Sequence, residues 1–291
     1  MTKTASKIAF LGLGVMGGPM AGHLAAKGFE VTVYNRTPAR ADAWLKAHQG
    51  RAAATPDEAV READIAFACL GDDPDVASVV EKAAVSLKPG AVVVDHTTAS
   101  PALARRLHGE LAELGVGFVD APVSGGQAGA ENGKLSVMCG GDDADVARAR
   151  SVMEAYSARI VHIGPAGSGQ LCKAVNQICI AGLLQGLSEG VHFAARSGLD
   201  IEKVLEAISG GAAQSWQMEN RAATMAQDEF DFGFAVDWMR KDLRIALGEA
   251  RENGDRLPVT ALVDQFYADI QAMGGGRWDT SSLVRRLSDA D

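Results

Sequence analysis

The chain has 291 residues, which is long enough for two domains that each bury a core of their own. Hydrophobic residues make up 47% of it and charged residues 22%, which is typical of a folded globular protein and excludes the disordered and collagen-like classes. The formal net charge of -9 repels phosphate backbones, so we expect no nucleic acid among its partners.

Short apolar runs alternate with longer helical patterns over the first 163 residues. Cap-and-proline signals mark helix starts at Thr55-Pro56, Asp73-Pro74 and Ser100-Pro101. This alternation predicts a parallel sheet covered by helices on both faces, a Rossmann-like doubly wound α/β domain over residues 1–164. The apolar runs are the candidate strands, at Ile8–Leu11, Val31–Tyr34, Ile65–Leu70, Ala91–Asp95, Val116–Asp120, Leu135–Cys139 and Arg159–Ile163.

After Gly164 the pattern changes, and apolar residues recur at three- and four-residue spacing. This periodicity predicts an all-α domain over residues 165–291, opening on a long helix over Gly169–Arg196 that joins the two domains. The most apolar part of that helix, Ala174–Leu187, is interrupted by three polar amides, so we expect no membrane span.

The four cysteines and six histidines show no spacing typical of metal ligands and no C-x-x-C pair, so we expect neither a metal nor a disulfide framework. The N-terminus is short and polar, without the apolar segment of a signal peptide. These features predict a cytoplasmic location.

A glycine-rich turn follows the first candidate strand. Residues Gly12–Gly17 have the G-x-G-x-x-G spacing, with a strand before them and a helix after them. In such a turn Gly12 permits the tight bend, Gly14 the approach of the backbone to a pyrophosphate, and Gly17 the packing of helix on strand. The sequence therefore predicts a dinucleotide site; a merely tight strand-to-helix turn is the alternative.

The end of the second candidate strand indicates which dinucleotide is preferred. An NAD-specific site carries Asp or Glu there to hold the ribose hydroxyls, whereas this chain reads Asn35-Arg36-Thr37. A carboxylate would repel a 2′-phosphate, while Arg36 can bind one. We expect NADP(H) as the preferred cofactor and NAD(H) as the alternative; a solvated loop arginine is the competing interpretation of Arg36.

Four segments of the chain, taken in this order, resemble the β-hydroxyacid dehydrogenase family, which includes 3-hydroxyisobutyrate dehydrogenases and several semialdehyde reductases. They are Gly12–Ala21, Asp120–Gly126, Gly164–Asn176 and Lys241–Leu247, and they span nearly the whole chain. The resemblance implies hydride transfer between a nicotinamide and a small anionic hydroxy acid or its aldehyde. It also implies a homo-oligomer, either a homodimer or a homotetramer, because the helical domains of this family pack between subunits.

By resemblance, Lys173 is the catalytic proton-transfer residue and Asn176 orients the substrate. Some members carry the asparagine one residue later, where this chain has Gln177, so Asn176 and Gln177 remain alternatives. A surface lysine is the alternative for Lys173. The residues expected to contact the substrate are Ser124, Gly125 and Gly126, for which a purely structural turn is the alternative.

The resemblance adds Leu70, Thr98 and Lys241 to the residues expected at the dinucleotide. Thr98 can equally be a loop hydrogen-bonding residue. The full cofactor set is Gly12, Leu13, Gly14, Met16, Gly17, Asn35, Arg36, Thr37, Leu70, Thr98 and Lys241.

Two other functions share this fold by resemblance. An imine reductase or reductive aminase usually lacks both the Ser-Gly-Gly loop and the helix lysine. A non-catalytic dinucleotide-binding module typically loses the lysine and gains basic surface. The Ser-Gly-Gly loop at Ser124 and the lysine at Lys173 argue against the first, and the retained Lys173 without a gain of basic residues argues against the second.

Overall fold

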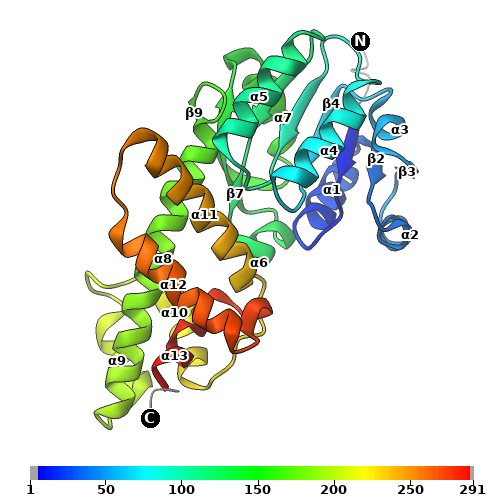
Figure 1. Ribbon diagram of the computed structural model, residues 1–291. Helices are drawn as coiled ribbons and strands as arrows, with labels where there is room; N and C mark the ends of the chain where they lie inside the picture. The colour runs from blue at the N-terminus through cyan, green and yellow to red at the C-terminus, as the bar shows by residue number, and fades with distance from the viewer. Residues whose placement is uncertain (1–5, 289–291) are drawn as a thin grey trace. The chain divides into compact units, whose positions relative to one another are not determined.

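The computed structural model describes residues 6–288 and divides into two compact units (Figure 1). The first, Met1–Lys173, is called the sheet unit below, and the second, Ala174–Asp291, the helical unit. The division falls within helix α8 (Ser168–Arg196), which is the long helix expected from the sequence.

Nine strands of the described residues form one sheet in the order β3-β2-β1-β4-β5-β6-β8-β7, and β9 also pairs with β8. All seven predicted strands are present. The two additional strands, β3 and β7, have two residues each, which is too short for an apolar alternation to show. The strands are β1 (Lys7–Leu11), β2 (Glu30–Tyr34), β3 (Arg51–Ala52), β4 (Ile65–Ala68), β5 (Val92–Asp95), β6 (Gly117–Asp120), β7 (Val123–Ser124), β8 (Leu135–Gly141) and β9 (Ser157–Gly164).

The doubly wound α/β fold is confirmed, and the sheet is parallel from β3 to β6. It departs from the predicted all-parallel arrangement at β8, which runs antiparallel to both β6 and β7. A parallel neighbour needs a crossover that returns the chain to the edge where the strand began. The connection from β6 to β8 holds only β7 and the short helix α6 (Gly126–Glu131), so the chain turns back instead.

Helices cover both faces of the sheet, as the side chains of β1 demonstrate. Ile8 and Phe10 belong to one hydrophobic core, and Ala9 and Leu11 to another, because successive side chains of a strand point to opposite faces. The first core includes residues of α1 (Gly17–Ala26), α2 (Pro38–Ala47), α6 and α7 (Asp143–Met153). The second includes residues of α3 (Pro56–Val60), α4 (Asp73–Ala84) and α5 (Pro101–Ala112).

The predicted caps hold at two helices and shift at the third. Thr55 accepts a hydrogen bond from the third residue of its helix, and so does Ser100. Helix α4 is capped by Asp72 instead of Asp73. The carboxylate of Asp73 accepts from the N–H of Ser100 at 2.8 Å, so it joins the loops that follow β4 and β5.

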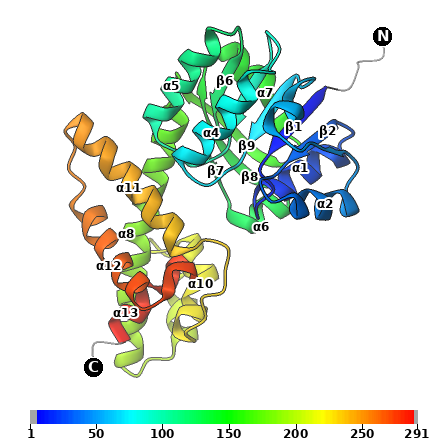
Figure 2. The same cartoon turned by 45° about the vertical axis from the view of Figure 1, so that its right-hand side comes forward.

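The helical unit contains no strand among the residues that the structure describes. Its central core brings together Ala181 and Leu184 of α8, Leu243 of α11 and Tyr267 of α12. Helices α11 and α12 run side by side (Figures 1 and 2). The elements are α8, α9 (Ile201–Ile208), α10 (Trp216–Ala226), α11 (Val236–Asn253), α12 (Pro258–Ala272), the 3-10 turns η1 (Gly275–Arg277) and η2 (Thr280–Val284), and α13 (Arg285–Ser288).

Helix α8 has 29 residues and, by length and composition alone, could cross a membrane. Its buried face, however, supplies core residues of the helical unit and the buried polar side chains of Gln177 and Ser188. Core helices of folded proteins pass the same test of length and hydropathy, so the apolar character of α8 is accounted for by this packing.

Candidate active site

The glycine-rich turn has the geometry that its spacing predicts. Gly12 has φ +103°, and a Cβ there would fall on the carbonyl oxygen of Cys69. A Cβ on Gly17 would fall on the carbonyl oxygen of Gly12, so helix and turn are packed as closely as glycine allows. Around Gly14, in contrast, the nearest atom to a Cβ is Nη1 of Arg40 at 3.9 Å. The backbone at Gly14 is therefore open on the side where a pyrophosphate would approach.

The end of β2 is joined to this turn by Asn35. Its Oδ1 accepts from the N–H of Leu13 at 2.9 Å, and its Nδ2 donates to the carbonyl of Thr37 at 3.0 Å. Both ends of the amide are thus bound to backbone, and Asn35 fixes the turn relative to β2. Such a contact is compatible with a cofactor site, in which Asn35 would support the loop.

Two arginines lie beside the turn. Arg36 is 83% exposed at its side chain and forms an ion pair with Asp75 of α4 at 2.9 Å. Arg40, in the first turn of α2, brings its guanidinium near Gly14. Arg40 was not among the residues expected from the sequence. The available signal was its place in the first turn of the helix that Thr37-Pro38 begins, directly after the end of β2.

A hollow of about 870 Å³ opens in the sheet unit between the end of β2 and helix α4. Its lining includes Tyr34, Pro74 and Ala77, and apolar surface predominates. The Arg36–Asp75 ion pair joins the same two elements. Asp57, Glu81 and Lys82 also line it, so its chemistry suits a group with an apolar face and polar edges.

The loops after β4 and β5 are tied together by Thr97. Its hydroxyl accepts from the N–H of Leu70 at 2.9 Å, and its own N–H donates to Asp95 at 2.9 Å. Thr97 is buried, whereas Thr98 is only half-buried. Thr97 therefore stabilises the loops, and Thr98 is the more exposed of the two threonines.

His96, between these loops, is a structural residue. It is 2% exposed, its Nδ1 lies 2.6 Å from the carbonyl of Ala121, and its Nε2 lies 2.8 Å from the hydroxyl of Tyr156. Burial lowers the pKa of His96 to about 4, so the ring is neutral at pH 7. The neutral ring is stacked on Phe67 and joins the start of the loop after β5 to Ala121 and Tyr156, and both of its nitrogens are used in these contacts.

The Ser-Gly-Gly segment ends β7 and begins α6. Ser124 is half-buried, and Gly125 and Gly126 are exposed with φ of +130° and +60°. These left-handed conformations favour glycine at both positions. The segment follows the carboxyl end of β6, the edge of the sheet at which open α/β folds bind ligands.

Lys173 lies in the second turn of α8 and is only 8% exposed. The interpretation of Lys173 as a surface lysine therefore does not fit the structure. Three residues earlier, Gln170 binds the backbone of the loop after β5, so the start of α8 lies against the carboxyl edge of the sheet.

The remaining predicted residues lie in the helical unit and form a chain of polar contacts. Asn176 donates to Gln177 at 2.7 Å, and Gln177, which is fully buried, donates to Asp242 at 2.6 Å. The other oxygen of Asp242 lies 3.1 Å from the ammonium of Lys241. Asp242 therefore has two partners, the ammonium of Lys241 and the amide of Gln177.

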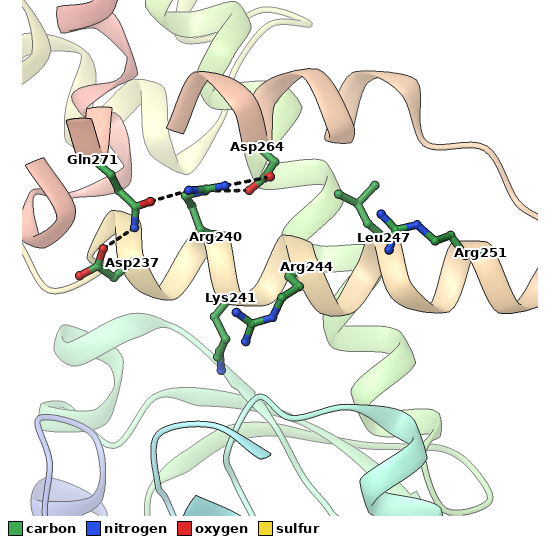
Figure 3. A pocket seen from close by; sticks show the side chains of 8 residues that line it. All are labelled: Asp237, Arg240, Lys241, Arg244, Leu247, Arg251, Asp264 and Gln271. Atoms are coloured by element: carbon green, nitrogen blue, oxygen red, sulfur yellow. Dashed lines mark hydrogen bonds and ion pairs between the residues drawn. The ribbon is translucent and has the colours of Figure 1, made fainter. Parts of the chain in front are cut away.

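Lys241 also lines a hollow of about 360 Å³ between α11 and α12, shown in Figure 3. Arg240, Arg244 and Arg251 of α11 line it as well, so its walls are rich in cations. Arg240 is bound to both oxygens of Asp264 and to Gln271. The hollow is also lined by Asp237 and Asp264, and Lys241 itself pairs with Asp242, so these carboxylates offset part of the positive charge.

Comparison with known proteins identifies the family. Residues 7–164 match the model of the NAD-binding domain of 6-phosphogluconate dehydrogenase, and residues 167–287 match the NAD-binding model of NADP-dependent 3-hydroxyisobutyrate dehydrogenase. The chain belongs to the β-hydroxyacid dehydrogenase family. It is an NAD(P)-dependent dehydrogenase that acts on CH–OH groups, so the non-catalytic alternative is set aside.

Individual members of the family match over nearly the whole chain. An uncharacterized oxidoreductase of Shewanella frigidimarina is 59% identical over 97% of this chain and 98% of its own length. The 2-hydroxy-3-oxopropionate reductase of Escherichia coli is 38% identical and covers 97% of both chains. The solved structure of Mycobacterium tuberculosis 3-hydroxyisobutyrate dehydrogenase with L-serine matches with a TM-score of 0.90 at 30% identity, over 98% of this chain and 99% of that one.

Proposed function

We propose that this enzyme transfers a hydride between NADP(H) and a small 3-hydroxy acid or the corresponding semialdehyde, with Lys173 as the proton-transfer residue. The observation that carries the proposal is the position of Lys173. It is the buried amine on the second turn of α8, directly after a turn bound to the carboxyl edge of the sheet. Open α/β sheets bind their ligands at that edge.

The preference for NADP(H) rests on the charges beside the glycine-rich turn. The end of β2 carries no acid, and Arg36 and Arg40 place two guanidinium groups within reach of it. A ribose 2′-phosphate is a dianion that guanidinium groups bind with paired, charge-assisted hydrogen bonds. The glycine geometry of Gly12 and Gly17 and the open backbone at Gly14 fit the pyrophosphate of the same cofactor.

When bound, the nicotinamide supplies the hydride acceptor or donor. During oxidation Lys173 takes the proton of the substrate hydroxyl, and during reduction it returns a proton to the carbonyl oxygen. Ser124 and the backbone of Gly125 and Gly126 hold the substrate carboxylate by hydrogen bonds. Asn176 orients the reacting carbon and is itself held by Gln177.

The test is a panel of 3-hydroxy acids and semialdehydes assayed with both nicotinamides, followed by Lys173→Ala. General acid–base groups contribute about 10² to 10⁴-fold, so the variant should lose that much of kcat while its dissociation constant for NADPH stays unchanged. Lys203→Ala is the matched control, because its side chain is 82% exposed on α9. A Lys173→Ala enzyme with near-normal kcat would show that Lys173 is not the proton-transfer residue.

A further inference from the structure

Two buried side chains bind the first turn of α8 to the sheet. Asp120, the last residue of β6, accepts from the N–H of Gly167 at 2.7 Å with one carboxylate oxygen and from the N–H of Gln170 at 2.9 Å with the other. These are backbone groups that have no partner within the helix itself. Burial raises the pKa of Asp120 to about 6, although these hydrogen bonds favour the ionised form.

Gln170 makes the second attachment with its side chain. Its Nε2 donates to the carbonyl of Thr97 at 2.7 Å, and its Oε1 accepts from the N–H of Ala99 at 3.1 Å. The side chain is 1% exposed, and both ends of its amide are bound to the loop that follows β5. The start of α8 is thus bound to strand β6 through Asp120 and to the loop after the neighbouring strand β5 through Gln170.

Two glycines let the backbones come close enough for these contacts. A Cβ on Gly169 would lie 2.6 Å from the carbonyl oxygen of Asp120 and 2.8 Å from its carboxylate. A Cβ on Gly140 of β8 would lie 2.8 Å from the backbone nitrogen of Gly169. The helix start therefore has little freedom to shift along or around its axis without breaking a hydrogen bond or a backbone contact.

We propose that Asp120 and Gln170 are positioning residues of the reaction: they set the axial and rotational place of the first turn of α8 and thereby the place of the Lys173 amine. Lys173 follows Gln170 by three residues, so both side chains lie on one face of the helix. This inference rests on the proposed role of Lys173. A displacement of about 1 Å at a catalytic group can cost about 10²-fold in rate, so the attachment governs turnover and not only stability.

The experiment replaces Gln170 by methionine, which has a similar volume and cannot make the two hydrogen bonds. We expect kcat to fall about 10 to 100-fold at pH 7.5, with the NADPH dissociation constant within twofold of wild type. Gln185→Met is the matched control, because Gln185 lies on the same helix and bonds only to Glu189 one turn on among the contacts of the described residues. A folded Gln170→Met enzyme with kcat within twofold of wild type would overturn the proposal.

A second variant covers the case in which Gln170→Met does not fold. In Gln170→Glu, the ionised side chain still accepts from Ala99 but faces the carbonyl of Thr97 with a negative charge. The protonated side chain can donate to that carbonyl. Asp120, which accepts from the backbone N–H of residue 170 and whose pKa burial raises to about 6, titrates in the same window in both enzymes. The ratio of the variant's kcat to that of wild type, measured at each pH, therefore follows the new carboxyl group and should rise as the pH is lowered from 8 to 5.5. A ratio that stays constant would contradict the positioning role.

A double-mutant cycle with Lys173→Ala separates this proposal from the proposed function. If Gln170 acts by placing the amine, Gln170→Met should change kcat less than threefold once the amine is gone, because coupled residues are not additive. An undiminished loss in the Lys173→Ala background would show that Gln170 acts otherwise, and the proposal would fall while the role of Lys173 stands. If Lys173→Ala alone keeps near-normal kcat, the proposed function fails, and the positioning proposal falls with it.

Discussion

Replacement of Arg36 by aspartate tests the cofactor preference most directly. In the structure Arg36 pairs with Asp75, but the two side chains are 83% and 39% exposed, and such exposed pairs contribute only about 0 to 1 kcal/mol. A hydrogen bond to a charged phosphate contributes about 1.5 to 3 kcal/mol. We therefore expect a bound 2′-phosphate to displace Asp75 from Arg36. Loss of one such contact should lower the ratio of kcat/KM for NADPH over NADH by about 10 to 150-fold, and we expect the added carboxylate to lower it further.

The assay is kcat/KM with each nicotinamide, for wild type and variant, at one ionic strength, because salt screens exposed phosphate contacts. Arg40→Ala should reduce the same ratio if the Arg40 guanidinium binds the 2′-phosphate, and should lower both values alike if it binds the pyrophosphate expected near Gly14. Arg159→Asp makes the same charge change on β9, at the other end of the sheet, and should leave the ratio unchanged. A wild type that prefers NADH, or an Arg36→Asp enzyme with an unaltered ratio, refutes the reasoning.

Three further predictions concern substrate, pH and assembly. Ser124→Ala should raise KM for the substrate or lower kcat without altering NADPH affinity in a fluorescence titration; loss of NADPH binding with intact substrate affinity would place the loop at the cofactor. Folding lowers the pKa of His96 from 6.5 to about 4, so between these pH values His96 is protonated only in the unfolded chain. The free energy of unfolding should therefore decrease by up to about 3 kcal/mol as the pH drops through that window. His96→Gln should flatten this slope in urea unfolding at pH 4.5 and 7, and an unchanged slope would exclude His96 as its cause. Phe193 is 71% exposed on α8, and a Cβ on Gly186 or Gly190 of the same helix would meet no atom within 4 Å. We propose that this helix face packs against a second copy of the chain. Light scattering should then show an oligomer for wild type and a smaller species for Phe193→Asp.

The parts of the fold that could be predicted are those governed by local chemistry. Buried parallel strands such as β4 and β5 consist mainly of consecutive apolar residues, which the sequence displays directly. Thr55 and Ser100 mark helix starts because each can accept a hydrogen bond from the first turn as an N-cap residue. The reversal at β8 could not be read in this way, because strand direction depends on which edge the chain reaches after a connection and not on the residues of the strand.

The candidate site was predicted where a single residue type carries the chemistry. Gly12 and Gly17 are required by backbone contacts that only glycine tolerates, so the motif and the geometry coincide. Arg40 and Gln170 were missed for a different reason. An arginine and a glutamine in helical segments are ordinary surface residues by composition, and only the packing of α2 beside the turn and of α8 on the sheet suggests the roles that we propose for them.

The choice between Asn176 and Gln177 shows how contacts decide what spacing leaves open. Both residues follow Lys173 within one helical turn, so either can face a substrate. Gln177 is fully buried; its amide nitrogen donates a hydrogen bond to Asp242 at 2.6 Å, and its oxygen accepts one from Asn176 at 2.7 Å. A side chain with both polar ends bound inside the helical unit cannot also turn toward a ligand without breaking its buried hydrogen bond to Asp242, whose other oxygen pairs with Lys241. Leaving a buried polar group without its hydrogen bond costs about 1 to 3 kcal/mol. Asn176 is only half-buried, and its contact with Gln177 uses its amide nitrogen and not its side-chain oxygen. We therefore infer that Asn176 contacts the substrate and that Gln177 holds Asn176 in place.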